Sequence, residues 1–252
     1  MSSIKLALVL AGFHAVASAE PSLYITTEHT VQSTRGEDET VLSQRVRQIA
    51  KRAGVSYAMQ QYPWKRAYAM ALSRPNGCVF ATTRTPEREA LFKWIGPIEE
   101  SEWYLAGRAG REFQIRTLED ARAYRIGTYS GDARHEYLRA RGFTLDPAQS
   151  DGANLPKLLL GRIDLWAMAM PKGTAPGSVN YPPDSVVPVL KFNTVRLYLA
   201  CNRAVPDSVV ARMNSAAEAV EREAGHRAPP PERRTRRPPC LLPAETSSPN
   251  CE

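Results

Sequence analysis

The chain has 252 residues, 23% of them charged, and a formal net charge of +7 at pH 7. Its Lys and Arg residues are scattered among acidic residues without a dense basic stripe, which argues against nucleic-acid binding. The mild positive excess suits an anionic ligand or none in particular. Four Cys and four His are present, but no CxxC or clustered His spacing predicts a metal site, and no other cofactor is expected.

Residues 1–19 have the pattern of a secretory signal peptide. The segment contains Lys5, an apolar stretch from Ile4 to Val16, and small residues at Ala17 and Ala19. Because the apolar stretch is short for a bilayer span, we expect cleavage after Ala19 and export to the periplasm. An uncleaved N-terminal anchor is the alternative.

The segment from residue 22 to residue 59 predicts a strand, a helix and a second strand. Ser22–Thr27 alternates in the manner of a strand, and apolar residues at helical spacing fill 40–53 before Gly54 ends the helix. The apolar face of that helix consists of Leu42, Val46, Ile49 and Ala53. Tyr57 and Met59 begin the next strand, and this β-α-β order is typical of a parallel sheet.

The stretch Tyr62–Ile98 predicts a helix, a turn and a buried strand. Pro63 suits the first turn of a helix, and Arg74 should end it because Pro75 follows. The apolar positions at helical spacing are Trp64, Ala67, Tyr68, Ala71 and Leu72. After the Asn76-Gly77 turn, the apolar run 78–81 is too short for a helix and fits a strand buried on both faces.

A second helix start follows this strand and predicts an anion site. Thr85, Pro86 and Glu87 read as an N-cap, a first-turn proline and an acid at the positive helix end. Hydroxyl groups, free N–H groups and the guanidinium of Arg88 therefore gather where a strand meets a helix, which favours carboxylate or phosphate binding. The alternative is that Arg88 caps its own helix or pairs with a neighbouring Glu.

The second half of the chain predicts a further lobe and a return to the first. Trp103–Arg108 is expected to cross between lobes, 117–120 to start a short helix, and Arg125–Tyr129 to form a strand. Gly131 and its neighbours lie between that strand and a helix, at a second junction able to bind an anion. A helix at 155–160, a strand at 163–168, an extended crossing at 186–192, a strand at 195–201 and a helix from Pro206 follow.

We therefore expect an α/β fold with two lobes, of which the first is discontinuous in sequence. The expected boundaries are 20–104 and 194–224 for lobe 1, 105–193 for lobe 2, and 225–252 for a tail. The tail is rich in Pro and Arg and lacks apolar periodicity, so we expect disorder, and we hypothesise that the natural C-terminal end has been lost.

Cys78 and Cys201 each lie at one end of a predicted buried strand. If those strands are antiparallel neighbours, the two sulfur atoms can form a disulfide, which persists in an exported protein. A pair of buried free thiols is the alternative.

Several segments together resemble the bacterial extracellular solute-binding proteins of family 3, the periplasmic receptors of amino-acid-type ABC importers. The segments are PWKRA at 63–67, RTPERE at 84–89, FKWIGPI at 92–98, RIGTYSGD at 125–132, LLLGRID at 158–164 and RLYLACNRAVPD at 196–207. The resemblance spans 22–224. It implies a type II periplasmic-binding-protein fold with a hinge of two crossing strands, a monomer, an anionic or zwitterionic small-molecule solute, and an inner-membrane ABC permease as partner.

The resemblance also implies roles for individual residues. In the family, the Arg of a T-x-x-R element holds the ligand carboxylate, and here Arg88 takes that position, with Thr83 matching the preceding hydroxyl residue. The family's Gly-Thr-Thr/Ser loop falls on Gly131, Asp132 and Ala133, so its side-chain donors are missing. An Asp at 132 would repel an anion unless it receives a ligand ammonium.

Family members that bind α-amino acids carry an acid where this chain has Ala169. Either Asp132 or Glu28 takes over the ammonium, or the ligand is not a standard amino acid, because an unpaired buried ammonium is costly. Trp166 and Met168 could line an apolar ligand portion or pack in the core.

Four further residues are candidate ligand contacts at the start of the second helix and along the first strand. Trp64 is expected to stack on a ligand or to pack, and Arg66 to bind an anion or to lie in solvent or in an ion pair. Tyr24 and Glu28 follow the first strand, where this fold places additional contacts.

The leading functional hypothesis is a binding module that closes two lobes over a carboxylate-bearing solute, with no bond chemistry. The second is an enzyme on the same fold, such as a dehydratase acting on a cyclic carboxylate, with Glu28, Asp132 or His135 as acid or base. The third is a sensory or degenerate homologue.

Overall fold

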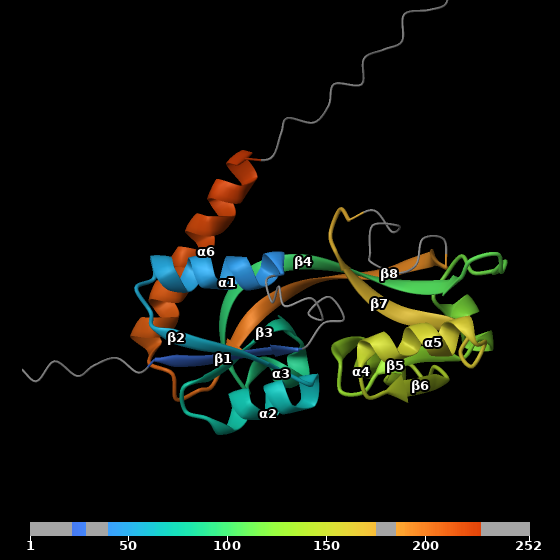
Figure 1. Cartoon of the computed structure of the whole chain (residues 1–252), viewed down its shortest axis with the longest axis horizontal. Helices are drawn as coiled ribbons and strands as arrows, with labels where there is room; N and C mark the ends of the chain where they lie inside the picture. Colours follow the sequence, from blue (N-terminus) through green and yellow to red (C-terminus); the bar gives the residue numbers. More distant parts are fainter. Residues whose placement is uncertain (1–21, 29–39, 175–184, 228–252) are drawn as a thin grey trace, which may run out of the picture.

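The computed structural model describes residues 22–28, 40–174 and 185–227. Figure 1 shows two lobes joined by two long strands, β4 (Lys93–Arg108) and β8 (Val186–Cys201). These strands are antiparallel neighbours along both lobes, in a sheet of order β2-β1-β3-β8-β4-β7-β5-β6. The predicted α/β fold with two lobes and two crossing strands is confirmed.

The first lobe is built on a parallel group of strands. β1 (Leu23–Glu28) lies parallel to β2 (Tyr57–Tyr62) and to β3 (Gly77–Thr83), and β3 lies antiparallel to β8. Parallel neighbours need crossover connections, and the chain supplies a helix after β1 and another after β2. The predicted β-α-β-α-β order is therefore confirmed.

Helices cover both faces of this sheet (Figure 1). On one face α1 (Val41–Arg52) lies near α6 (Asp207–Arg227), and on the other lies α2 (Trp64–Ser73). The Thr40 hydroxyl accepts a hydrogen bond from the Ser43 N–H at 3.1 Å and so caps α1. The apolar face of α1 then packs into the lobe 1 core against residues of β1, β3, β8 and α6, as its helical spacing predicts.

A disulfide joins two strands of the lobe 1 core. Cys78 of β3 and Cys201 of β8 are direct partners across the antiparallel ladder and are bonded to each other. Both residues are fully buried. The disulfide therefore fixes the returning strand to the first half of the lobe, and it is the first of the two alternatives that the sequence left open.

The second lobe has a parallel three-stranded group and a separate apolar core. β5 (Ile126–Tyr129) lies between β7 (Leu165–Pro171) and β6 (Leu145–Ala148), and β7 pairs with β4. The short helices of this lobe are α4 (Ala133–Arg139), α5 (Asn154–Leu159) and the 3-10 helices Glu119–Ala123 and Asp151–Ala153. β6 has no strand pattern in its sequence, and its Pro147 is tolerated because the strand is at the edge of the sheet.

Local details differ from the sequence-based expectation. Pro63 precedes α2 as its N-cap residue, and Leu72 is 40% exposed although its spacing predicted burial. Thr85 precedes the single-turn helix α3 (Pro86–Glu89), but its side chain makes no capping hydrogen bond. α6 continues to Arg227, three residues beyond the expected end of lobe 1 at 224.

Two predictions fall outside the described residues. The signal peptide at 1–19 and the part of the tail from 228 onward belong to this group. Within the ranges that the structure describes, none of the helices combines the length and apolar character needed to cross a bilayer.

Candidate functional site

The lobes meet where α2 begins and where β5 leads into α4. Trp64 is the first residue of α2, so its backbone N–H has no acceptor within the helix. That N–H donates to the Tyr129 hydroxyl at 2.9 Å, and the Trp64 indole Nε1–H donates to the Gly131 carbonyl oxygen at 3.1 Å. Trp64 of lobe 1 therefore binds directly to the β5–α4 turn of lobe 2.

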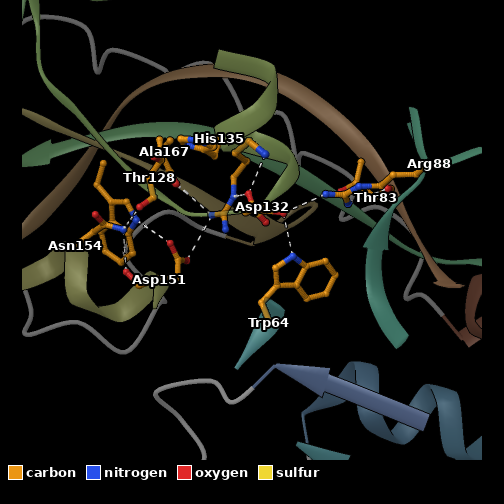
Figure 2. A network of polar contacts seen from close by, with 12 residues as sticks. Trp64, Thr83, Arg88, Thr128, Asp132, His135, Asp151, Asn154 and Ala167 are labelled. Atoms are coloured by element: carbon orange, nitrogen blue, oxygen red, sulfur yellow. Dashed lines mark hydrogen bonds and ion pairs between the residues drawn. The ribbon is translucent and has the colours of Figure 1, made fainter. Parts of the chain in front are cut away.

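Arg88 contacts the same turn from the junction of β3 and α3. Its side chain is buried, and Nη2 donates to the Gly131 carbonyl oxygen at 3.2 Å (Figure 2). Nη1 donates to the Thr83 carbonyl oxygen at 3.4 Å, and the guanidinium lies 5.2 Å from the centre of the Tyr68 ring. The structure thus brings Arg88 and Thr83 together, but through the Thr83 backbone and not through its hydroxyl.

The turn from Tyr129 to Asp132 presents this carbonyl to lobe 1. The Asp132 N–H donates to the Tyr129 carbonyl oxygen at 3.1 Å, which closes a four-residue turn. Gly131 occupies its third position with a φ of 81°, as a type II turn requires. A residue with a Cβ atom would be strained there, so glycine permits the turn that presents this carbonyl to lobe 1.

Asp132 is engaged within its own lobe. Its side chain accepts hydrogen bonds from the Arg134 N–H at 2.8 Å and from Arg134 Nε at 2.6 Å, which makes it the N-cap of α4. Burial opposes the charged carboxylate, but the charge and hydrogen bonds of Arg134, together with the charge of Arg88, lower the pKa of Asp132. Asp132 is therefore ionised and already paired. Ala133, the next residue, is buried.

Arg134 is the centre of a polar network that motif spacing does not predict. Its side chain is 8% exposed, and Nη1 lies 3.2 Å from the Ala167 carbonyl oxygen and 3.5 Å from the Asp151 carboxylate. Trp166 Nε1 donates to the other Asp151 oxygen at 3.1 Å. Burial raises the pKa of Asp151, with Arg134 acting in the opposite direction. Only the spacing Asp-x-Arg at 132–134 gave a local signal for this network.

Glu28 faces the network from the end of β1. Burial is the largest cause that raises its pKa to about 8, and the charge of Asp151 adds to it, while Arg134 acts in the opposite direction. Its carboxyl group also hydrogen-bonds with Tyr129, whose own pKa is raised by burial and then by Glu28. Glu28 therefore carries a proton over much of the neutral pH range and lies against the second lobe.

Two predicted site residues contact other groups. The Tyr24 hydroxyl lies 2.7 Å from the Tyr62 hydroxyl, and Arg74 lies 4.0 Å from the centre of the Tyr24 ring. Arg66 is exposed and lies 4.5 Å from the centre of the Tyr62 ring. These contacts all lie within lobe 1, so the structure does not bring Tyr24 and Arg66 to the Gly131 turn.

The remaining candidates pack within lobe 2. His135 Nδ1 lies 2.9 Å from the Thr128 hydroxyl. Trp166 and Met168 belong to a buried cluster with Leu158 and Ile163, so core packing is their observed role. Ala169, where the resembling family carries an acid, is an exposed residue of β7.

A small cavity lies beside Glu28 at the carboxyl ends of the lobe 1 strands. Its volume is about 70 Å³, and its lining includes Thr27 and Glu28 of β1, Phe80 and Ala81 of β3, and the start of α1. Ala81 has a φ of 59°, which is unusual for a residue other than glycine. Across the described ranges, no group of three or more His, Cys, Asp or Glu is placed to bind a metal ion.

No family model matches the chain, and no curated protein matches its sequence. A histidine kinase sensor domain with similarity to periplasmic binding proteins aligns at a TM-score of 0.71 and 18% identity, covering 82% of this chain and 92% of that one. The arginine-bound form of truncated ArgBP from T. maritima aligns at a TM-score of 0.68 and 16% identity, covering 79% and 96%.

The arginine-, lysine-, histidine-binding protein ArtJ from Geobacillus stearothermophilus aligns at a TM-score of 0.68 and 14% identity, covering 82% of this chain and 92% of that one. Identities this low establish a shared fold and nothing more specific. The chain therefore has the two-lobed architecture of periplasmic binding proteins.

Proposed function

We propose that this protein is a periplasmic solute-binding protein of the family 3 type, which holds a small carboxylate-bearing solute between its lobes for an inner-membrane ABC importer. Arg88 carries the proposal. It is a buried guanidinium at the meeting point of the lobes, and its hydrogen-bond acceptors among the described residues are the neutral carbonyl groups of Thr83 and Gly131. A guanidinium with neutral acceptors retains donors and charge for a carboxylate.

The topology supports the same position. Ligands of open α/β sheets bind outside the carboxyl ends of the parallel strands. β1 and β3 end at Glu28 and Thr83, and the cavity beside Glu28 lies at this edge. We therefore place the solute between Arg88 and Glu28, with Asp132, Gly131 and Ala133 of lobe 2 lining its other side.

The class of solute follows from the charged groups and from the named neighbours. Arg88 and Arg134 are opposed by Asp132 and Asp151, so an added carboxylate leaves the site with excess negative charge unless the solute also carries a cation. ArgBP in its arginine-bound form and ArtJ bind such zwitterions. We propose a basic or neutral amino acid or a close derivative. Its cationic group lies beside Glu28, which releases its proton to solvent on binding and so replaces the acid missing at Ala169.

A calorimetric titration tests the proposal with matched ligands and matched variants. L-Arginine, L-histidine and L-glutamine are the candidate solutes, and agmatine, which is arginine without its carboxylate, is the ligand control. Arg88→Gln should weaken binding of the best solute about 10- to 100-fold, because one charge-assisted interaction is lost. Arg84→Gln is the control variant, since Arg84 is exposed and pairs with Glu89. Equal binding of arginine and agmatine, or full binding by Arg88→Gln, contradicts the proposal.

A sensory role is a second candidate, and the likeness to a histidine kinase sensor domain favours it. A sensor and a transport receptor both bind the solute, but only the receptor supports uptake. Uptake of radiolabelled solute is compared between cells with and without the protein. Loss of uptake without the protein indicates a transport receptor, and unchanged uptake indicates a sensor. An enzymatic role has less support, because Asp132 is ion-paired and His135 is bonded to Thr128. Of the three acid or base candidates for that role, this leaves Glu28.

A further inference from the structure

The lobes are joined by hydrogen bonds that converge on a single turn. Trp64 N–H donates to the Tyr129 hydroxyl, and Trp64 Nε1–H and Arg88 Nη2 both donate to the Gly131 carbonyl oxygen. Figure 2 shows Trp64 and Arg88 approaching the same place beside Asp132. All donors belong to lobe 1 and all acceptors to the turn of lobe 2. We call this set of contacts the Gly131 latch.

An aromatic contact accompanies the latch. Tyr129 is 3% exposed, and its side chain belongs to a cluster made mainly of lobe 1 residues. The lobe 1 members are Trp64, Ala67, Ala71, Val79, Phe92 and Ala200. Burying a tyrosine ring removes a large apolar surface from water, so the turn of lobe 2 is anchored in lobe 1 by packing as well as by hydrogen bonds.

Lobe 2 holds the acceptor in place before the lobes meet. The Tyr129–Asp132 turn is closed by its own backbone hydrogen bond, and Asp132 is fixed by Arg134, which is itself buried between Asp151 and the Ala167 carbonyl. Little conformational freedom is therefore lost when Trp64 and Arg88 bind the turn.

We propose that the Gly131 latch holds the two lobes closed through protein groups alone, and that a ligand carboxylate competes with the Gly131 carbonyl for Arg88. A carboxylate that binds a guanidinium with two parallel hydrogen bonds uses Nη2 in either orientation, end-on with Nη1 or side-on with Nε. Nη2 is the atom that donates to Gly131. Nη2 carries two N–H groups, so it can bind both oxygens only side by side. There the negative carboxylate oxygen repels the partly negative Gly131 carbonyl oxygen and weakens its hydrogen bond to Arg88.

The competition for Arg88 rests on the proposed function, whereas the latch itself does not. A latched protein responds to solute by exchanging the Gly131 carbonyl for the solute carboxylate. Binding must therefore offset the free energy of the latch, which weakens the apparent affinity for the solute. The same holds for any protein whose binding-competent state is only partly populated.

Hydrogen exchange of the tryptophan indole groups tests the latch in the wild-type protein. The three informative indoles differ in their acceptors: Trp64 binds Gly131 across the lobes, Trp166 binds Asp151 within lobe 2, and Trp94 binds the Glu89 carbonyl at an exposed position. Their resonances in a nitrogen–proton correlation spectrum are assigned with Trp→Phe variants. We expect the Trp64 indole to exchange at least about ten-fold more slowly than that of Trp94.

Tyr129→Phe provides the variant, because it removes the hydroxyl that accepts from the Trp64 backbone N–H and keeps the ring. Loss of that bond should loosen the turn to which the Trp64 indole donates. It should accelerate exchange of the Trp64 indole at least about five-fold and leave Trp166 unchanged. Exchange at Trp64 as fast as at Trp94 in the wild type overturns the latch. So does a Tyr129→Phe protein that melts cooperatively and still protects Trp64 fully.

Addition of L-arginine separates the latch from the proposed function. Where calorimetry detects binding, the solute carboxylate should weaken the bond from Arg88 to Gly131 and so loosen the latch. The Trp64 indole, which donates to the same carbonyl, should then exchange faster in the complex. An unchanged exchange rate overturns the competition for Arg88. A protein that protects Trp64 but binds none of the three amino acids contradicts the proposed function and leaves the latch standing. Binding of an amino acid, together with fast exchange of the Trp64 indole in the free protein, supports the proposed function and overturns the latch.

Discussion

Nε of Arg134 lies 2.6 Å from Oδ1 of Asp132, and this ion pair links the turn that faces lobe 1 to the interior of lobe 2. The Asp132 side chain caps α4, and the Arg134 guanidinium continues to Asp151 and to the Ala167 carbonyl. A position where the resembling family carries a ligand donor is therefore occupied by an internal salt bridge. The turn and the lobe core depend on the same guanidinium.

Replacing Arg134 with Met should strongly destabilise the protein. The variant leaves the carboxylates of Asp132 and Asp151 without their cation, and breaking a buried pair in this way costs about 3–5 kcal/mol of unfolding free energy. Urea denaturation followed by circular dichroism measures the loss. Arg139→Met is the control, because Arg139 lies on the same helix and pairs with Glu136 at an exposed position. Similar small losses in both variants would show that the network contributes little.

The stability of the protein should fall as the pH rises through the neutral range. The pKa of Glu28 is about 8 in the folded protein against an ordinary value of 4.5, so the folded chain binds more protons than the unfolded chain between these values. Unfolding free energy then decreases with pH in that window, by at most about 1.4 kcal/mol per pH unit for one group.

Glu28→Gln isolates this contribution, because glutamine resembles the protonated carboxyl group. The variant should match the wild type near pH 5 and exceed it in melting temperature at pH 8. The titratable groups that face Glu28 are Asp132, Asp151 and Tyr129, and Arg134 supplies the opposing charge. A difference between the proteins that does not vary with pH would refute the assignment.

Reduction of the Cys78–Cys201 disulfide should destabilise the protein substantially. The bond joins residues 123 positions apart, and closing a loop of this length lowers the entropy of the unfolded chain by an amount worth about 5 kcal/mol. Melting curves with and without a reducing agent measure the effect. The Cys78→Ala, Cys201→Ala double variant should melt at the lower temperature in both conditions, and a reductant-sensitive double variant would point to another cause.

Asn202→Ala should weaken the end of α2. The Asn202 Nδ2 group donates to the carbonyl oxygens of Ala71 and Leu72, which lie in the last turn of the helix. Loss of these bonds should cost about 1 kcal/mol in urea denaturation. Asn193→Ala serves as control, because the Asn193 side chain bonds only to the adjacent Thr194 N–H among the interactions of the described residues. No difference between the two variants would contradict this role for Asn202.

Local periodicity predicted most of lobe 1. The helical spacing of Val46 and Ile49 and the short apolar run after Gly77 depend on neighbouring residues alone, and the structure places a helix and a strand there. β6 escaped prediction because its sequence LDPA has no strand pattern. That strand forms through pairing with β5, which supplies hydrogen bonds that sequence spacing does not encode.

The order of residues alone places Arg88 near Thr83, because the two lie five positions apart across one strand-to-helix junction. What meets Arg88 depends on how the two lobes pack, because the Gly131 carbonyl comes from 43 residues away on the other lobe. The same is true of Arg134, whose partner Asp132 is local but whose partner Asp151 is 17 residues distant. Charge and hydrogen-bond satisfaction in a buried site depend on which elements pack together, and that choice is made by the whole fold.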